Sequence, residues 1–186
     1  DSKKLFHEKF PYVIPGLYKR IVDEMLVELN LLSHQNDFTQ DYLFCVGLTE
    51  TFKELTKGYK PEKHLNLLFE SLCSSSNFEA NEIKEISQKS QKEFKDKSSQ
   101  DIFNLLKEKS KSNLYPSRIL NLGMYIILSN SQDFKQEDES KLNKHISEIS
   151  EKLNLSSNKA EKDIGIYKST ISKMKQAKEL IEELKI

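Results

Sequence analysis

The sequence is poor in the residues that break helices and in those that form disulfide frameworks. Its 186 residues include five glycines, four prolines, two cysteines and no tryptophan. So few glycines and prolines favour a helical chain over one rich in turns and strands. Cys45 and Cys73 stand in the apolar stretches YLFCVGL and LLFESLC, where a thiol usually acts as a small buried hydrophobe. A disulfide scaffold is therefore excluded, and a reducing compartment fits.

The chain also lacks a net charge and a long hydrophobic run. Lys plus Arg and Asp plus Glu both number 29, so the formal net charge is zero, and the positive field that non-specific nucleic-acid binding needs is missing. The most apolar run, residues 119–128, has about half of the roughly 20 residues that a spanning helix needs. We therefore expect a soluble chain that binds no nucleic acid. Because it begins with Asp1 rather than Met, a targeting segment removed upstream is compatible with the sequence.

Motifs for metal and nucleophilic chemistry are missing as well. None of the four histidines has a Glu three residues before it, as the carboxylate-bridged metal sites of helix bundles require. The sequence contains no His-Glu-x-x-His, no Gly-x-Ser-x-Gly and no Gly-rich phosphate loop, the signatures of metalloproteases, serine hydrolases and nucleotide-binding proteins. We therefore expect no metal site and no nucleophilic or phosphate-binding site of these kinds.

What the sequence does contain is helical periodicity, with Pro near helix starts and Gly just past helix ends. Pro15 precedes the first long apolar stripe, and Gly58 follows a later one, which is the usual asymmetry of helix boundaries. No segment alternates with the period of a strand. We predict an all-α fold, with a compact multi-helix globular domain over residues 1–133 and a C-terminal helical extension over residues 134–186.

The C-terminal extension carries a narrow apolar seam. Its members recur at helical spacing on both sides of an NLSS turn: Leu142, Ile146, Ile149 and Leu153, then Ile164, Tyr167, Ile171, Met174 and Ile181. This spacing predicts a helical hairpin or a coiled-coil-like arm that packs on the globular domain or projects from it. The seam falters at Lys178, so we expect residues 178–186 to be the least covered part. We also expect the globular part to fold without residues 156–186.

The stretch YKRIVDEMLVELNLL, residues 18–32, raises a separate question. Its apolar side chains form one stripe, yet Val27 and Leu31 fall on the opposite side, among the charged residues Arg20, Glu24 and Glu28. A metal or catalytic site, a partner surface and burial between two helical layers are the three explanations. Two other helices are also apolar all round and contain Gly47 and Gly123, where a neighbouring backbone can approach closely. We therefore expect Val27 and Leu31 to be buried against a second layer.

Three long stretches carry a family resemblance. They are FPYVIPGLYKRIVDEMLVELNLLS, DFTQDYLFCVGLTETFKELTKGYKPE and EKDIGIYKSTISKMKQA. With them the chain resembles the thylakoid formation protein family, also called the photosystem II biogenesis protein family, of cyanobacteria and plastids. The stretches are long and unrepetitive and follow the family's order, whereas the Lys- and Ser-rich middle of the chain adds no such signal.

The resemblance implies a non-enzymatic, all-helical accessory protein of photosystem II biogenesis and repair. It implies association with the membrane-anchored thylakoid FtsH protease, support of that protease's accumulation, and work on photosystem II assembly or repair intermediates. It also implies peripheral contact with the thylakoid membrane from its cytoplasmic side, which is stromal in plastids, with a soluble pool besides. No cofactor is implied.

The family's motif positions supply candidates for the partner contact. Among these positions Pro15, Gly47, Gly58 and Pro61 have structural reasons to start, pack or stop helices. Five others lack so plain a reason and are the partner-binding candidates, together with four residues of the C-terminal seam: Tyr18, Arg20, Glu24, Tyr59 and Lys60, and Tyr167, Ile171, Met174 and Ile181.

Two other functions compete with the adaptor role. A pigment- or lipid-handling protein would hold its ligand between the apolar helices, and His34, near a helix end, is the candidate pigment ligand. A purely structural organiser of the membrane is the second alternative, and a survey of partners separates it from the adaptor.

Overall fold

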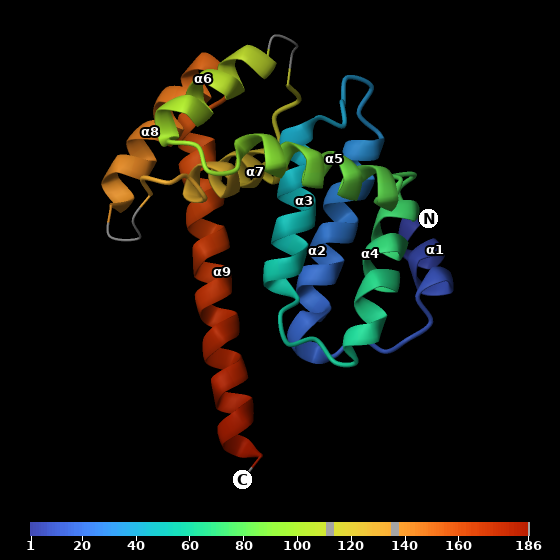
Figure 1. The fold of residues 1–186 in the computed structure, drawn as a ribbon. Helices are drawn as coiled ribbons and strands as arrows, with labels where there is room; N and C mark the ends of the chain where they lie inside the picture. Colours follow the sequence, from blue (N-terminus) through green and yellow to red (C-terminus); the bar gives the residue numbers. More distant parts are fainter. Residues whose placement is uncertain (111–113, 135–137, 186) are drawn as a thin grey trace. The chain divides into compact units, whose positions relative to one another are not determined.

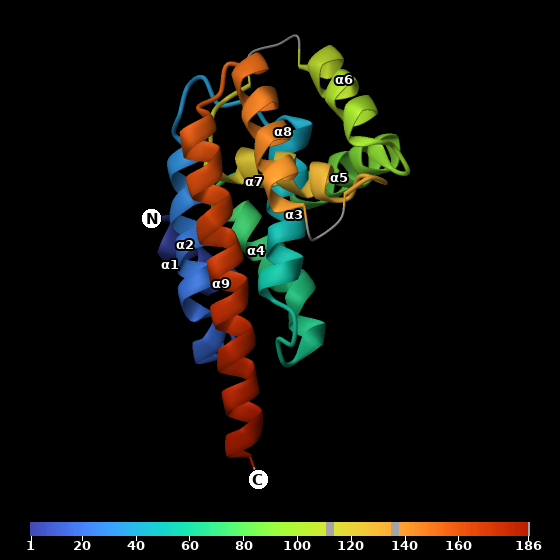
Figure 2. The ribbon, with the colours of Figure 1, turned by 90° about the vertical axis from the view of Figure 1, so that its left-hand side faces the viewer.

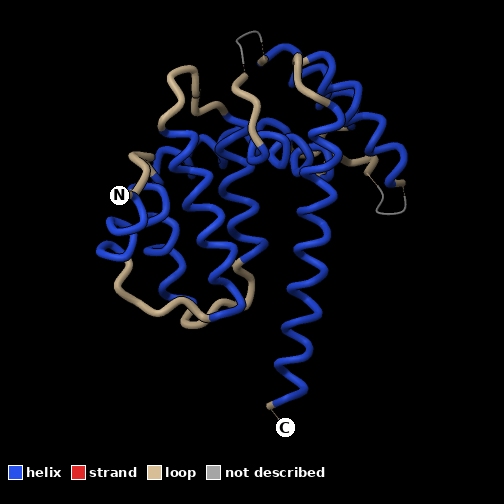
Figure 3. Tube along the Cα trace, turned by 180° about the vertical axis from the view of Figure 1, so that it is seen from behind, coloured by secondary structure: helices blue, strands red, loops and turns tan. Residues whose placement is uncertain are grey.

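The computed structural model describes residues 1–110, 114–134 and 138–185, and its regular elements are helices (Figure 3). In chain order they are α1 (Ser2–Lys9), α2 (Gly16–Ser33), α3 (Tyr42–Leu55), the 3-10 helix η1 (Glu62–His64), α4 (Leu65–Ser74), α5 (Ala80–Phe94), α6 (Ser99–Lys109), α7 (Arg118–Ser129), α8 (Glu139–Lys152) and α9 (Ser157–Leu184). The described residues contain no strand. The prediction of an all-α fold is confirmed.

The helices form two compact units built from non-contiguous segments. Unit 1 comprises Asp1–Phe38, Phe52–Ile83 and Thr170–Ile186, and unit 2 comprises Thr39–Thr51 and Lys84–Ser169. The boundary between the units falls in the loop after α2 and within α3, α5 and α9, and the division expected at residue 133 stays a prediction.

Unit 1 is organised around α2, which contacts α1 and α4 (Figure 1). Seven side chains of α2 are buried at the helical spacing that the sequence predicts, namely Tyr18, Ile21, Val22, Met25, Leu26, Leu29 and Leu32. They meet Phe6 of α1 and Leu68, Phe69 and Leu72 of α4 in one apolar core. Because that stripe must face the core, it fixes which side of α2 is turned to solvent.

Unit 2 contains a close crossing of α3 and α7. A Cβ atom added to Gly47 would lie 2.0 Å from the backbone oxygen of Ile119, and one added to Gly123 would lie 2.0 Å from that of Leu43. Only glycine permits such an approach at both positions. The expected close approach at these glycines is confirmed. Helix α7 also contacts α6 and α8, and α6 contacts α8 (Figure 2).

A buried polar cluster attaches the first half of α9 to α7 within unit 2. Asn121 donates from Nδ2 to Oδ2 of Asp163 over 3.0 Å, and Lys159 donates from Nζ to Oδ1 of the same carboxylate over 2.9 Å. Asp163 is 3% exposed, and these bonds compensate for burying its charge. Lys168 of α9 also pairs with Glu139 at the start of α8 over 3.2 Å. A hairpin arm formed by α8 and α9 stays a prediction.

None of the helices in the described ranges is both long enough and apolar enough to cross a bilayer.

Candidate functional site

The outer face of α2 exposes the two apolar side chains that fall among charged residues in the sequence. Val27 and Leu31 are each 59% exposed, so the expectation that they are buried against a second layer is wrong. They continue a row that begins with Arg20 and Glu24, at intervals of four, three and four residues along the helix. Residues at this spacing share one side of a helix. We call Arg20, Glu24, Val27 and Leu31 the α2 ridge.

The charged half of the α2 ridge is a surface ion pair. Arg20 donates from Nε to Oε1 of Glu24 over 2.8 Å, and the two side chains are 88% and 48% exposed. A pair of this kind contributes about 0.3–0.5 kcal/mol to a helix, so the fold hardly depends on it. The ridge therefore presents two apolar side chains beside one cation and one anion, a composition suited to a helix or loop of another protein.

Tyr18 and Tyr59, two of the predicted partner-binding residues, are buried at 4% and 1% exposure. Their ring centroids lie 5.1 Å apart, and Tyr18 donates its hydroxyl to the backbone oxygen of Lys57 over 2.8 Å. Burial raises the pKa of both hydroxyls. Gly58, whose φ is +83°, turns the chain directly before Tyr59. The contacts seen here are internal, because the two rings attach the loop after α3 to the first turn of α2. Lys60, by contrast, is exposed.

The candidates on α9 divide along the helix. Tyr167 and Met174 are buried and Ile171 is half-buried, whereas Ile181 is 41% exposed and has the exposed Leu180 and Leu184 beside it. Every residue from 179 to 185 is exposed, and we call this segment the α9 tail. The expected lack of cover toward the C-terminal end is confirmed for these residues. The buried half of the seam belongs to the core.

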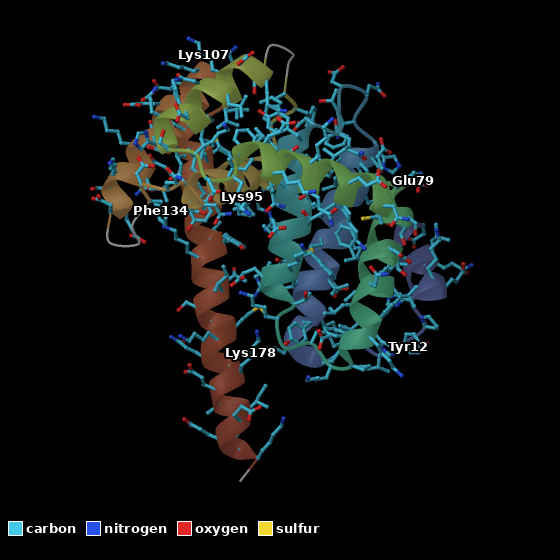
Figure 4. The ribbon with its side chains drawn as sticks, in the orientation of Figure 1. Tyr12, Glu79, Lys95, Lys107, Phe134 and Lys178 are labelled. Atoms are coloured by element: carbon cyan, nitrogen blue, oxygen red, sulfur yellow. The ribbon has the colours of Figure 1, made fainter. Side chains whose placement is uncertain are left out.

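Lys178, in unit 1, is the last half-buried residue of α9 before the exposed α9 tail. It projects from the helix (Figure 4), and its Nζ atom lies 5.8 Å from the centroid of the Tyr18 ring. A cation over an aromatic face is attracted by the ring's quadrupole. The side chain that interrupts the apolar seam in the sequence thus fits against α2, and the α9 tail begins directly after it.

Comparison with known proteins identifies the family. Residues 1–186 match the family described as Thylakoid formation protein. The chain is 80% identical over 186 residues to Protein Thf1 of Prochlorococcus marinus strain MIT 9312, an alignment that covers 100% of this chain and 92% of that relative. The chain belongs to the thylakoid formation protein family.

More distant members of the thylakoid formation protein family share the whole length as well. Protein Thf1 of Parasynechococcus marenigrum strain WH8102 is 39% identical over 184 residues, which are 98% of this chain and 86% of that protein. A solved structure of Psb29 resembles the fold with a TM-score of 0.87 at 26% identity, covering 99% of this chain and 93% of that one. The family is linked to thylakoid formation and to photosystem II.

His34, the candidate pigment ligand, lies at the C-terminal end of α2 with an exposed ring. Its Nδ1 atom is 2.7 Å from the backbone oxygen of Asn30. The residue lines an open hollow of about 440 Å³, whose other walls are mostly polar or charged: Asp1, Ser2, Lys4, Leu5, Glu8, Asn30, Ser33, Ser75, Ser76 and Asn77. An extended apolar pigment prefers an apolar pocket, so this hollow does not favour the pigment-handling alternative.

The described part of the chain holds no group of three or more His, Cys, Asp or Glu side chains placed to bind a metal ion. Cys45 and Cys73 are both buried thiols, as the apolar context of each predicts.

Asp41 is a half-buried carboxyl group directly before the first residue of α3. Its Oδ1 atom accepts a bond from the backbone N–H of Phe44 over 2.9 Å, at the start of α3. Its Oδ2 atom is buried without a hydrogen-bond partner. Burial raises the pKa of Asp41 to about 6, against the opposing effect of the backbone bonds.

Proposed function

We propose that this protein is a non-enzymatic accessory protein of photosystem II biogenesis and repair, which associates with the thylakoid FtsH protease and supports its accumulation. It works from the cytoplasmic side of the thylakoid membrane, as a peripheral protein with a soluble pool. Its further partners are photosystem II assembly or repair intermediates. Family membership supports the thylakoid and photosystem II parts of this proposal.

The α2 ridge is the observation that carries the adaptor role. Val27 and Leu31 lie one helical turn apart and are each 59% exposed. Single exposed apolar residues are ordinary on protein surfaces, but two in register on one helix form a row that a partner helix can cover. Arg20 and Glu24 extend the row with opposite charges, which give a docked segment a preferred direction.

The α9 tail offers a second surface for the same partner. Leu180, Ile181 and Leu184 are exposed at 57%, 41% and 76%, although a helix that ends in solvent gains nothing from apolar side chains at these positions. We therefore assign the protease contact to the α2 ridge first and to the α9 tail second.

A deletion strain of a photosynthetic host tests the proposed function. Loss of the protein should lower the amount of FtsH protease and slow the recovery of photosystem II after strong light. The protease is quantified by immunoblotting, and recovery is followed by variable chlorophyll fluorescence with and without an inhibitor of protein synthesis. Unchanged FtsH levels in the deletion strain would count decisively against the adaptor role.

A further inference from the structure

The loop between α1 and α2 exposes an apolar tip on a rigid base. Val13 is 92% exposed and Tyr12 is 47% exposed, while Phe10, two residues before Tyr12, is 1% exposed and anchors the loop in unit 1. Pro11 and Pro15 flank the tip and restrict its backbone. Val13 has the largest exposed fraction among the large apolar residues that the structure describes.

Ring stacking holds this tip in place. The Tyr12 ring lies 3.9 Å from the His64 ring at 23° between their planes, and the Phe10 ring meets the Tyr12 ring edge-on at 5.4 Å. Figure 4 shows Tyr12 on the loop that follows α1. The loop is therefore presented by its neighbours with its apolar tip outward, and ordering it on a ligand would cost little conformational entropy.

The stack with His64 brings a lysine-bearing segment to the tip. Lys60 and Lys63 precede His64 and are exposed, and Lys9 at the end of α1 is exposed as well. The acidic residues nearby in the sequence are Glu8 and Glu62, and Lys57 is held by Glu54 in an ion pair of 2.5 Å. The exposed lysines thus lie close to the apolar tip and do not form a broad positively charged surface.

We propose that the tip, Tyr12 and Val13, inserts into the headgroup region of a membrane that contains anionic lipid, with Lys60 and Lys63 binding the headgroups. A peripheral lipid contact needs only a few apolar groups and some cations. This inference deepens the membrane-contact part of the proposed function and does not depend on the protease contact.

Vesicle binding by the full chain tests this inference. The protein is sedimented with phosphatidylcholine vesicles that contain or lack phosphatidylglycerol. We expect binding to the anionic vesicles, weakened by salt. Val13→Ser should weaken vesicle binding about tenfold, because the apolar Val side chain no longer inserts into the lipid. Lys60→Glu with Lys63→Glu should remove the preference for phosphatidylglycerol. The matched control, Val27→Gln with Leu31→Gln on the α2 ridge, should bind vesicles like the parent.

A fluorescent reporter gives an independent readout, because the chain has no tryptophan. Val13→Trp should show an emission shift to shorter wavelength on adding anionic vesicles, and Leu31→Trp should show none. Equal vesicle binding by the parent and Val13→Ser, or no shift for Val13→Trp, overturns the inference. So does a parent that self-associates in sedimentation velocity while Val13→Ser is monomeric, since a second copy then covers the tip. Co-purification of Val13→Ser with FtsH from detergent extracts is scored separately and tests only the protease contact.

Discussion

Gly47 and Gly123 bring the backbones of α3 and α7 into direct contact in unit 2. The nitrogen of Gly123 would be 3.0 Å from a Cβ atom on Gly47, and the converse distance is also 3.0 Å. Each helix thus uses its only glycine to admit the other. Because backbone atoms form both sides of the contact, no side-chain rotation can make room for a methyl group.

Gly47→Ala should therefore destabilise the protein by about 3 kcal/mol or more, since its new methyl group would clash with the Ile119 carbonyl. Gly165→Ala is the matched control, because nothing lies within 4 Å of that Cβ position in the exposed middle of α9. That change should be neutral or stabilise by up to about 1 kcal/mol. Urea unfolding followed by circular dichroism measures both. Similar midpoints for the parent and Gly47→Ala would refute the close crossing.

The two buried tyrosines of unit 1 should respond differently to loss of their hydroxyl groups. Tyr18→Phe removes the bond to the Lys57 carbonyl and should cost about 1 kcal/mol. Tyr59→Phe removes a buried hydroxyl that has no partner and should be neutral or stabilising. Thermal melting of both variants gives the comparison. A larger loss for Tyr59→Phe than for Tyr18→Phe would contradict the contacts described here.

Ionisation of Asp41 should lower the stability of the protein as pH rises, whereas most carboxylates in folded proteins stabilise the fold when they ionise. The pKa of Asp41 is raised from 3.8 to about 6 by burial, so the folded state holds the proton more tightly than the unfolded state. Its ionisation therefore costs stability as pH rises from about 4 to 6, and the cost is complete above about pH 6.

Asp41→Asn keeps the acceptor for the Phe44 N–H and removes the titration. The melting temperature of this variant relative to the parent should be higher at pH 7.5 than at pH 5, by the equivalent of about 1 kcal/mol. Subtracting the parent at each pH cancels the other titrating groups. A difference that does not change with pH, or that changes in the other direction, would exclude a raised pKa at Asp41.

Truncation should separate the two halves of α9. A chain ending at Lys178 loses only residues that are exposed or lie outside the described ranges, and it should melt cooperatively near the full-length temperature. A chain ending at Leu155 loses the buried Ala160, Ile164 and Tyr167 and should not fold cooperatively. Calorimetry distinguishes the two results. Cooperative melting of the shorter chain would instead agree with the expectation that the globular part folds without residues 156–186.

Much of the fold could be predicted because helical periodicity is a local signal. The buried stripe of α2, the turn at Gly58 and the close approach at Gly47 all follow from the residues themselves. The two compact units could not, because they join segments distant in sequence, and no local pattern encodes which segments meet. The short helix α1 has a single buried residue, Phe6, which is too weak a periodic signal to predict it.

The candidate site was harder to predict than the fold. Val27 and Leu31 are apolar, and composition alone does not distinguish burial against a second layer from exposure to a partner. Tyr18 and Tyr59 lacked an evident structural role only because their contact spans 41 residues of sequence. Val13 could have been noticed as an apolar residue in a proline-framed loop, but its exposure depends on the stack between Tyr12 and His64.

Co-purification from the native membrane tests the central claim most directly. A deletion strain is complemented with affinity-tagged parent, with Val27→Gln plus Leu31→Gln, or with Ile166→Gln as a control at an apolar residue of α9 that is 47% exposed. FtsH is quantified in eluates from solubilised thylakoids, normalised to the tagged protein. The account predicts that the parent and Ile166→Gln recover the protease and that the ridge variant loses most of it while melting at the parent temperature. Equal recovery by the ridge variant would contradict the assignment of the α2 ridge as the partner surface.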